Sequence, residues 1–189
     1  VGRGAIDTTQ RGFRSVISPA FGMDWSESNC ESCGSCVSAC PTGALSTKAQ
    51  NPFRVFETER VRTTCTYCGV GCQIDLLVKD GKVVDARPAD GPVSKGLLCV
   101  KGRFAFDFVN NEQRLKTPLV RKDGELVEAT WDEALDLIAD KIQETKRDFG
   151  PDAVAGFSSA RTINEDNYLF QKFLRAAVGT NNVDHCARL

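Results

Sequence analysis

Four cysteines in the stretch CESCGSCVSACP, residues 30–41, have the spacing C-x2-C-x2-C-x3-C-P. Cysteine runs of this spacing hold iron–sulfur clusters, with three cysteines on one cluster and the fourth on another. Cys30, Cys33 and Cys36 are therefore predicted to ligate one 4Fe-4S cluster, and Cys40 to ligate a second. Structural zinc or a disulfide is the alternative, but zinc sites favour paired knuckles over a run of three. The 29 upstream residues contain no cysteine that could complete either cluster.

A second group of cysteines follows the pattern C-x2-C-x3-C, and a fourth cysteine comes after 26 intervening residues. It consists of Cys65, Cys68, Cys72 and Cys99. Spacing alone also allows half of a zinc ribbon. The stretch TCTYCGVGC places Gly69 and Gly71 where the backbone can pass close to a bulky inorganic core, which glycine permits. We therefore predict a 4Fe-4S cluster with four ligands from this chain.

Composition limits the other functions that are open to the chain. Its 189 residues carry 24 basic and 25 acidic side chains, a net charge of -1, so no bulk field would attract nucleic acid or an anionic membrane. No apolar run approaches the roughly 18 residues of a transmembrane helix. Nine cysteines in tight groups favour metal and a reducing compartment over a disulfide framework. The chain begins at Val1 without a targeting signal, and we expect a cut end there.

The elements that must position these groups change along the chain. Residues 1–50 predict a small loop-rich module, and residues 47–53 a linker. Asp80-Gly81 and Asp123-Gly124 each predict the turn of a β-hairpin. A helix should then begin at a capping box of Thr130 and Glu133 and end at Gly150. Its apolar face is predicted to contain Leu135, Ile138 and Ile142.

The last forty residues read as the opening of an α/β domain. A short buried strand is expected at 153–157, a helix from Thr162 or Asn164 to Ala177 with Gly179 as its cap, and a further strand at 181–186. A parallel sheet of so few strands cannot bury both faces, so we expect the domain to continue beyond Leu189. The predicted fold class is α+β followed by α/β.

Three stretches, TCTYCGVGCQIDLLV, GLLCVKGRFAFDFV and NNVDHCARL, resemble the start of molybdenum or tungsten bis-pterin oxidoreductases. The last is most similar to formate dehydrogenase catalytic subunits. The resemblance implies a partial ferredoxin-like 4Fe-4S module at 1–54, a small β-rich 4Fe-4S domain at 55–107, and the beginning of an α/β molybdopterin-binding domain at 108–189. It also implies that Lys101 lies between the second cluster and the pterin. Without the resemblance, a solvated surface lysine is the better interpretation.

The resemblance further implies a cytoplasmic enzyme that oxidises formate at a molybdenum or tungsten bis(molybdopterin guanine dinucleotide). Electrons would leave through the Cys65 cluster and then the Cys30 cluster to iron–sulfur or flavin partner subunits linked to NAD or ferredoxin. An upstream module would complete the ligands of the first run, including Cys40. The metal-ligating cysteine or selenocysteine is expected just after Leu189, so this chain would contain no catalytic residue. The alternatives are another bis-pterin enzyme such as a nitrate reductase, a non-catalytic relay subunit of the complex I type, and a zinc-stabilised binding module.

Other residues carry weaker signals. Ser158, Ser159 and Arg161 follow a predicted strand and precede a helix, where they could bind a pterin phosphate or simply cap the helix. His185 is expected to be a hydrogen-bonded structural histidine. Cys186 is expected to be a packed thiol and not a ligand.

Overall fold

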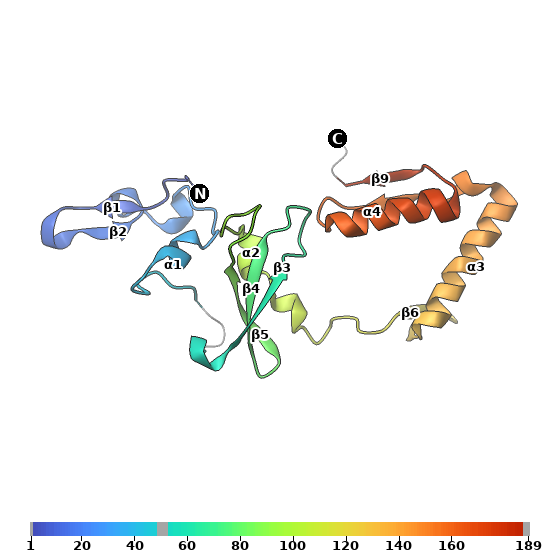
Figure 1. The fold of residues 1–189 in the computed structure, drawn as a ribbon, viewed down its shortest axis with the longest axis horizontal. Helices are drawn as coiled ribbons and strands as arrows, with labels where there is room; N and C mark the ends of the chain where they lie inside the picture. The colour runs from blue at the N-terminus through green and yellow to red at the C-terminus, as the bar shows by residue number, and fades with distance from the viewer. Residues whose placement is uncertain (1, 49–52, 187–189) are drawn as a thin grey trace. The chain divides into compact units, whose positions relative to one another are not determined.

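The structure is a computed structural model that describes residues 2–48 and 53–186. The chain divides into two compact units (Figure 1). The first comprises Val1–Cys65 and Cys72–Asn110, and the second Thr66–Gly71 and Asn111–Leu189. The domain boundaries expected from the sequence, at 54/55 and 107/108, stay a prediction. Among the described residues, no helix combines the length and apolar character that crossing a bilayer requires.

The first cysteine group lies in a part of the first unit that has little regular structure. Strands β1 (Asp7–Thr9) and β2 (Val16–Ser18) form a short antiparallel pair. Helix α1 (Ser35–Ala39) is five residues long and contains Cys36. These short elements agree with the expected loop-rich module. The expected linker at 47–53 lies partly outside the described residues.

An antiparallel sheet forms the centre of the first unit, in the order β3 (Glu59–Thr64), β4 (Gln73–Lys79), β5 (Lys82–Pro88). Asp80 and Gly81 join the last two strands with positive φ angles of 51° and 72°, which confirms the predicted hairpin. Strand β3 was not expected, because its sequence ERVRTT has no alternating apolar residues and all six residues are exposed. Strand β3 has no buried face, and its antiparallel pairing with β4 is what holds it in the sheet.

The core of the first unit lies between this sheet and helix α2 (Val100–Phe104), which packs against β5. Leu77 and Ala86 are 1% and 0% exposed. Other buried apolar residues are Ile74, Val83, Ala89 and Leu98. Asp75, Asp85 and Arg103 are also buried, so charged groups are part of this core and must be paired.

The second unit begins with the other predicted hairpin, β6 (Leu119–Lys122) and β7 (Glu125–Glu128), which is confirmed. Helix α3 (Trp131–Phe149) follows. The Glu133 amide donates to Thr130 Oγ1 at 3.2 Å, as a capping box requires. The Glu133 carboxylate itself pairs with Lys122 at 2.6 Å. Gly150 ends the helix with a φ of +84°.

Strand β8 (Gly156–Ser158) pairs in parallel with β9 (Val183–His185), and helix α4 (Asn164–Phe173) connects them. The helix continues as a π-helical turn to Val178 and is capped by Gly179, with a φ of 91°. The expected strand at 153–157 is present but begins at Gly156, and the expectation that it is buried was wrong for Phe157. Pro151–Ala153 is a 3-10 turn, and Phe157 is 83% exposed.

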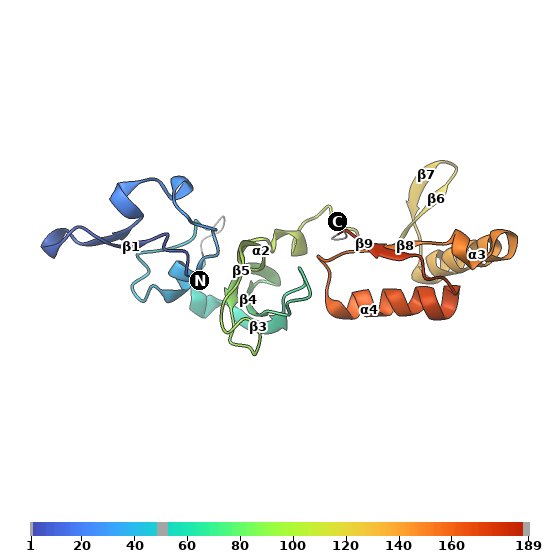
Figure 2. The ribbon, with the colours of Figure 1, turned by 90° about the horizontal axis from the view of Figure 1, so that it is seen from above.

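The exposure of Phe157 has a simple cause in the layers of this unit. Helix α4 lies on one side of the β8–β9 pair (Figure 2), where a Cβ on Gly156 would meet Leu174 and Phe170. Phe157 alternates to the opposite side of the strand. That side carries no second layer within the described residues of this unit.

Candidate iron–sulfur sites

The backbone around the first cysteine group turns sharply and directs amide groups at sulfur. Ser32 and Gly34 have φ angles of 54° and 70°. The Ser32 amide donates to Cys30 Sγ at 3.4 Å, and the Leu45 amide donates to Cys40 Sγ at 3.4 Å. Backbone amides that point at cysteine sulfurs stabilise thiolates and tune a cluster bound by them.

Two thiols of this group are biased toward the thiolate form, which is the form that binds metal. The hydroxyl of Thr42 and then the amide of Leu45 lower the pKa of Cys40 to about 7. The pKa of Cys33 is lowered as well, first of all by its hydrogen bond with the Ser35 side chain, in which Cys33 Sγ and Ser35 Oγ are 3.3 Å apart. Both shifts fit cysteines that ligate metal.

In the second group, the sheet brings two cysteines together. Cys65 follows β3 and Cys72 precedes β4, and the Cys65 amide donates to the Cys72 carbonyl at 2.8 Å. Cys99 immediately precedes α2. A Cβ on Gly102 would lie 3.5 Å from Cys65 Sγ, so the buried Cys65 sulfur rests against the first turn of α2.

The fourth cysteine of this group, Cys68, belongs to the segment Thr66–Gly71, which clusters with the second unit. There the Asn164 side-chain amide donates to the carbonyl of Gly69 at 2.8 Å. A Cβ on Gly69 would stand 2.3 Å from Asn164 Oδ1, and Gly71 has a φ of +74°. Gly69 is therefore needed for the close contact with Asn164, and Gly71 for its positive φ angle. Both needs are separate from the predicted approach of the backbone to a cluster.

Across residues 2–48 and 53–186, no three His, Cys, Asp or Glu side chains are close enough to hold a single metal ion. A 4Fe-4S cluster uses its four cysteine ligands on four separate irons, so its sulfurs stand further apart than the ligands of one ion. All nine cysteines lie among the described residues and none forms a disulfide. The thiol set and its amide donors fit such clusters, and the ligand assignment of the eight grouped cysteines stays a prediction.

Lys101 is exposed on α2, two residues after Cys99. Its backbone carbonyl accepts from the Ala105 amide at 2.9 Å, which closes the helical turn. The lysine side chain thus projects from the helix that begins at a predicted cluster ligand. Its proposed place between cluster and pterin stays a prediction.

Ser159 and Arg161 lie between β8 and α4, as the sequence predicts. The Arg161 amide donates to Ser159 Oγ at 3.1 Å, and the Asn167 side chain donates to the Ser159 carbonyl at 3.2 Å. Ser158 Oγ is hydrogen-bonded to the Asn167 side chain as well. These bonds order the turn, and Arg161 is exposed beside it. The phosphate-binding role of the pair stays a prediction.

The end of β9 differs from one expectation. Cys186 is exposed, so the expected packed thiol was wrong; it follows a strand with no further layer over it in the described part of this unit. The hydrogen bond between Ser159 Oγ and Cys186 Sγ, 3.5 Å apart, lowers the pKa of Cys186. His185 is exposed as well, at the last position of β9.

Sequence reasoning missed three residues that organise these sites. Asn164 holds the Cys68 loop, and Arg103 and Asp85 form a buried pair at 2.6 Å beside α2. Asp85 gave a signal, since it is a charge in the middle of the apolar strand KVVDARP. Arg103 gave another, since it stands four residues after Cys99 on the same helical face.

Three family profiles match the chain. Residues 23–46 match a 4Fe-4S binding domain, residues 58–111 the molybdopterin oxidoreductase Fe4S4 domain, and residues 114–189 molybdopterin oxidoreductase. Each of the two cysteine groups lies inside one of the two iron–sulfur matches, and Cys186 lies outside both.

Individual relatives agree with the family profiles. The chain is 55% identical over 134 residues to F420-dependent formate dehydrogenase 1 subunit alpha of Methanococcus maripaludis, covering 70% of this chain and 19% of the relative. The second such subunit of that organism matches to the same extent. A Staphylococcus aureus (strain Mu50) protein, named provisionally as a formate dehydrogenase, is 38% identical over 202 aligned positions, covering 86% of this chain and 20% of the relative. The chain thus spans about a fifth of the length of these curated relatives.

Proposed function

Because the chain belongs to the molybdopterin oxidoreductase family, we propose that it forms the electron-transfer portion of a formate dehydrogenase catalytic subunit. The observation that carries the proposal is the 55% identity to formate dehydrogenase alpha subunits, which extends over 70% of the chain. The match to a 4Fe-4S binding domain at 23–46 adds a second iron–sulfur region before the molybdopterin portion.

Each part of the chain has its own task in this proposal. Cys65, Cys68, Cys72 and Cys99 hold one 4Fe-4S cluster. Cys30, Cys33 and Cys36 hold three irons of another, and Cys40 serves a further cluster in an upstream ferredoxin-like module. The amides that point at Cys30 and Cys40 support this, because they stabilise the ligating thiolates. The region 108–189 opens an α/β domain that binds the pterin.

When bound, a molybdenum or tungsten bis(molybdopterin guanine dinucleotide) would take two electrons from formate as carbon dioxide and a proton are released. The residues of this chain bind and orient it. Lys101 places a positive charge on the helix that follows Cys99. Arg161 offers a guanidinium beside the ordered Ser159 turn, where a phosphate of the cofactor could be held.

The electrons would pass from the Cys65 cluster to the Cys30 cluster and then to partner subunits. We propose iron–sulfur or flavin partners linked to NAD or ferredoxin, in the cytoplasm. The clustering of eight cysteines without a disulfide supports a reducing compartment.

The test uses the complete protein, purified without oxygen. We expect iron and acid-labile sulfide in comparable amounts, bound molybdenum or tungsten, and formate-dependent reduction of a dye. A protein with both clusters but without bound pterin metal or formate activity would instead be a relay subunit of the complex I type. Stoichiometric zinc without sulfide would overturn the iron–sulfur assignment altogether.

A further inference from the structure

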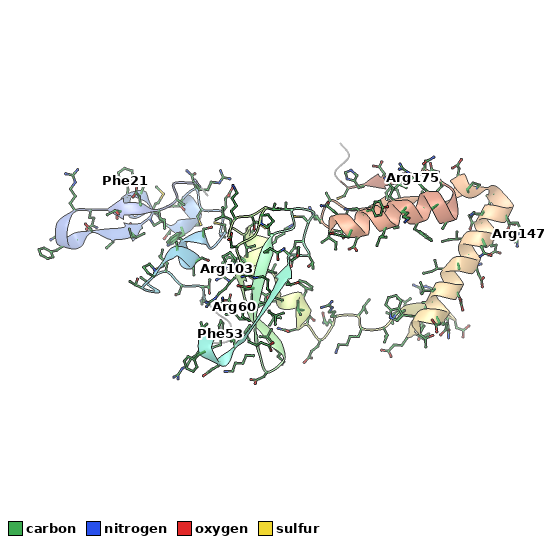
Figure 3. All side chains as sticks on the ribbon, in the orientation of Figure 1. Phe21, Phe53, Arg60, Arg103, Arg147 and Arg175 are labelled. Carbon is green, nitrogen blue, oxygen red and sulfur yellow. The ribbon has the colours of Figure 1, made fainter. Side chains whose placement is uncertain are left out.

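Arg103 is a buried arginine of helix α2 in the first unit (Figure 3). Its residue is 3% exposed, and it stands on α2 four residues after Cys99. The Nη1 atom donates to Asp85 Oδ1 at 2.6 Å and to the carbonyl of Ala86. These bonds fix the guanidinium on β5.

The stem of the same side chain touches the first cysteine loop. A Cβ on Gly34, between Cys33 and Ser35, would lie 3.0 Å from Arg103 Cγ and 3.2 Å from its Nε. It would also lie 3.1 Å from the ring of Phe104. Gly34 has a φ of +70°, so glycine is needed there both for the turn and for this close approach.

The Nε atom of Arg103 is buried and has no hydrogen-bond acceptor in the described part of the chain. Buried donors are nearly always paired, so an unpaired one on a charged group calls for a reason. Arg103 also lines a cavity of about 640 Å³ together with Cys40, Asp85 and Arg87. The unpaired Nε–H group of Arg103 therefore lies beside the loop of the first cysteine group. Arg103 also faces the cavity that Cys40 lines.

The charged groups around Asp85 do not cancel. Asp85 pairs with Arg87 at 3.1 Å as well as with Arg103 at 2.6 Å. Two guanidinium groups on one carboxylate leave a net positive charge. Arg87 is the more exposed of the two, with 37% of its side chain accessible against 4% for Arg103, so solvent screens it more.

We propose that Arg103 is a positioning residue that joins the Cys33–Cys36 loop to the helix after Cys99 and places a buried positive charge beside the first cluster. The proposal rests on the proposed function, because it assumes a cluster on Cys30, Cys33 and Cys36. Adding an electron to a cluster adds negative charge, which a nearby buried cation stabilises. Arg103 thereby raises the reduction potential of the first cluster, so that this cluster accepts electrons from the second one.

The experiment is a redox titration of both clusters by electron paramagnetic resonance in the complete protein. In Arg103→Gln, we expect the ratio of reduced to oxidised first cluster at a fixed potential to fall about tenfold, which is about 59 mV for one electron. The second cluster is titrated in the same samples and should shift less than the first, because the Arg103 side chain lies against Gly34 of the first cysteine group. Arg103→Lys keeps the charge and should recover most of the shift.

Arg87→Gln is the matched control, since it removes the same charge and another partner of Asp85 but leaves the contact with Gly34. Its shift of the first cluster should be at most about a third of that in Arg103→Gln, because its charge is screened. Gly34→Ala tests the same contact from the cysteine loop: the added methyl group would displace the Arg103 stem, so the reduction potential of the first cluster should fall in the same direction as in Arg103→Gln.

Equal shifts in Arg103→Gln and Arg87→Gln, or no shift in either, would overturn the proposal. If Arg103→Gln does not accumulate as folded protein, Gly34→Ala decides: an unchanged reduction potential of the first cluster would overturn the proposal. The wild-type protein separates this result from the proposed function. If the wild type binds no iron and sulfide, the proposed function fails; if it binds both clusters, only the role of Arg103 is being tested.

Discussion

The two units of the chain solve the problem of burial differently. In the first unit, the β3–β5 sheet and α2 enclose a core in which Leu77 and Ala86 are 1% and 0% exposed. In the second unit, the apolar stripe predicted on α3 is real but uncovered, with Leu135 and Ile138 54% and 52% exposed. A cavity of about 440 Å³ lies along this stripe and is lined also by Phe173 of α4.

This difference in burial indicates how much of each predicted cofactor site a unit can form from its own residues. The first unit orders Cys65, Cys72 and Cys99 beside its buried core, so it provides three of the four predicted ligands of the second cluster, while Cys68 belongs to the second unit. The second unit has two parallel strands and helices with exposed apolar faces, which an α/β domain covers with further layers. The two described strands β8 and β9 leave sheet faces that such a domain would cover, and the aligned part of this chain covers 19% of the Methanococcus maripaludis relative.

The largest expected effect concerns formate oxidation. The 189-residue chain, loaded with iron, sulfide and a molybdopterin source, should show no formate-dependent dye reduction, whereas the complete protein should. The physical reason is that a metal centre needs fixed ligands and a shielded cavity, which the open second unit does not provide. Formate-dependent dye reduction by the 189-residue chain would show that the second unit suffices to hold the metal centre. It would contradict the contrast drawn between the two units.

The next effect concerns the cluster of the first unit. Cys65→Ser removes a buried cysteine that is a predicted ligand, so we expect loss of the second cluster and a marked fall in bound iron and sulfide, measured chemically on anaerobic protein. Cys186→Ser is the control, since its exposed thiol lies outside both groups and its loss should leave iron content unchanged. A Cys65→Ser protein with full iron content would contradict the ligand assignment.

A core substitution in each unit should separate them by stability. Leu77→Ala is expected to lower the free energy of unfolding of the first unit by about 2–5 kcal/mol, because it leaves a cavity at a site that is 1% exposed. Leu135→Ala in the second unit should cost less than about 0.5 kcal/mol in this chain, because its side chain is 54% exposed. Urea unfolding followed by circular dichroism measures both, and equal losses would mean that α3 is covered in solution.

The smallest effect is a pH dependence within the first unit. Arg62 donates to Asp75 and lowers the pKa of this buried carboxyl group. A lowered pKa in the folded state gives stability that is present above the unfolded value of about 3.9 and lost as the pH falls through the folded value. Unfolding by urea at pH 7 and at pH 3 should therefore show a loss on acidification that is smaller in Asp75→Asn. An identical loss in both proteins would exclude Asp75 as its source.

The sequence predicted the features that depend on neighbouring residues. Both hairpins follow from Asp-Gly pairs that adopt positive φ angles, and α3 begins and ends at its capping residues Thr130 and Gly150. Strand β3 was missed because its formation depends on β4 and not on an apolar pattern.

Contacts between distant parts of the chain were beyond reach for the same reason. The pairing of Arg103 with Asp85 spans 18 residues, the approach of Gly34 to Arg103 spans 69 positions of sequence, and the bond from Asn164 to Gly69 spans 95. Cysteine spacing identified candidate ligands, but it contains no information on the side chains that hold the loops in place.

In the proposed route, electrons from formate reach the cluster on Cys30, Cys33 and Cys36 only through the cluster on Cys65, Cys68, Cys72 and Cys99. Electron paramagnetic resonance of the complete protein, frozen after formate is added without oxygen, tests it most directly. We predict reduced signals from both clusters in the wild type. In Cys65→Ser, formate should no longer reduce the Cys30 cluster, although dithionite still does. Reduction of that cluster by formate at the wild-type rate in Cys65→Ser would contradict the proposed route.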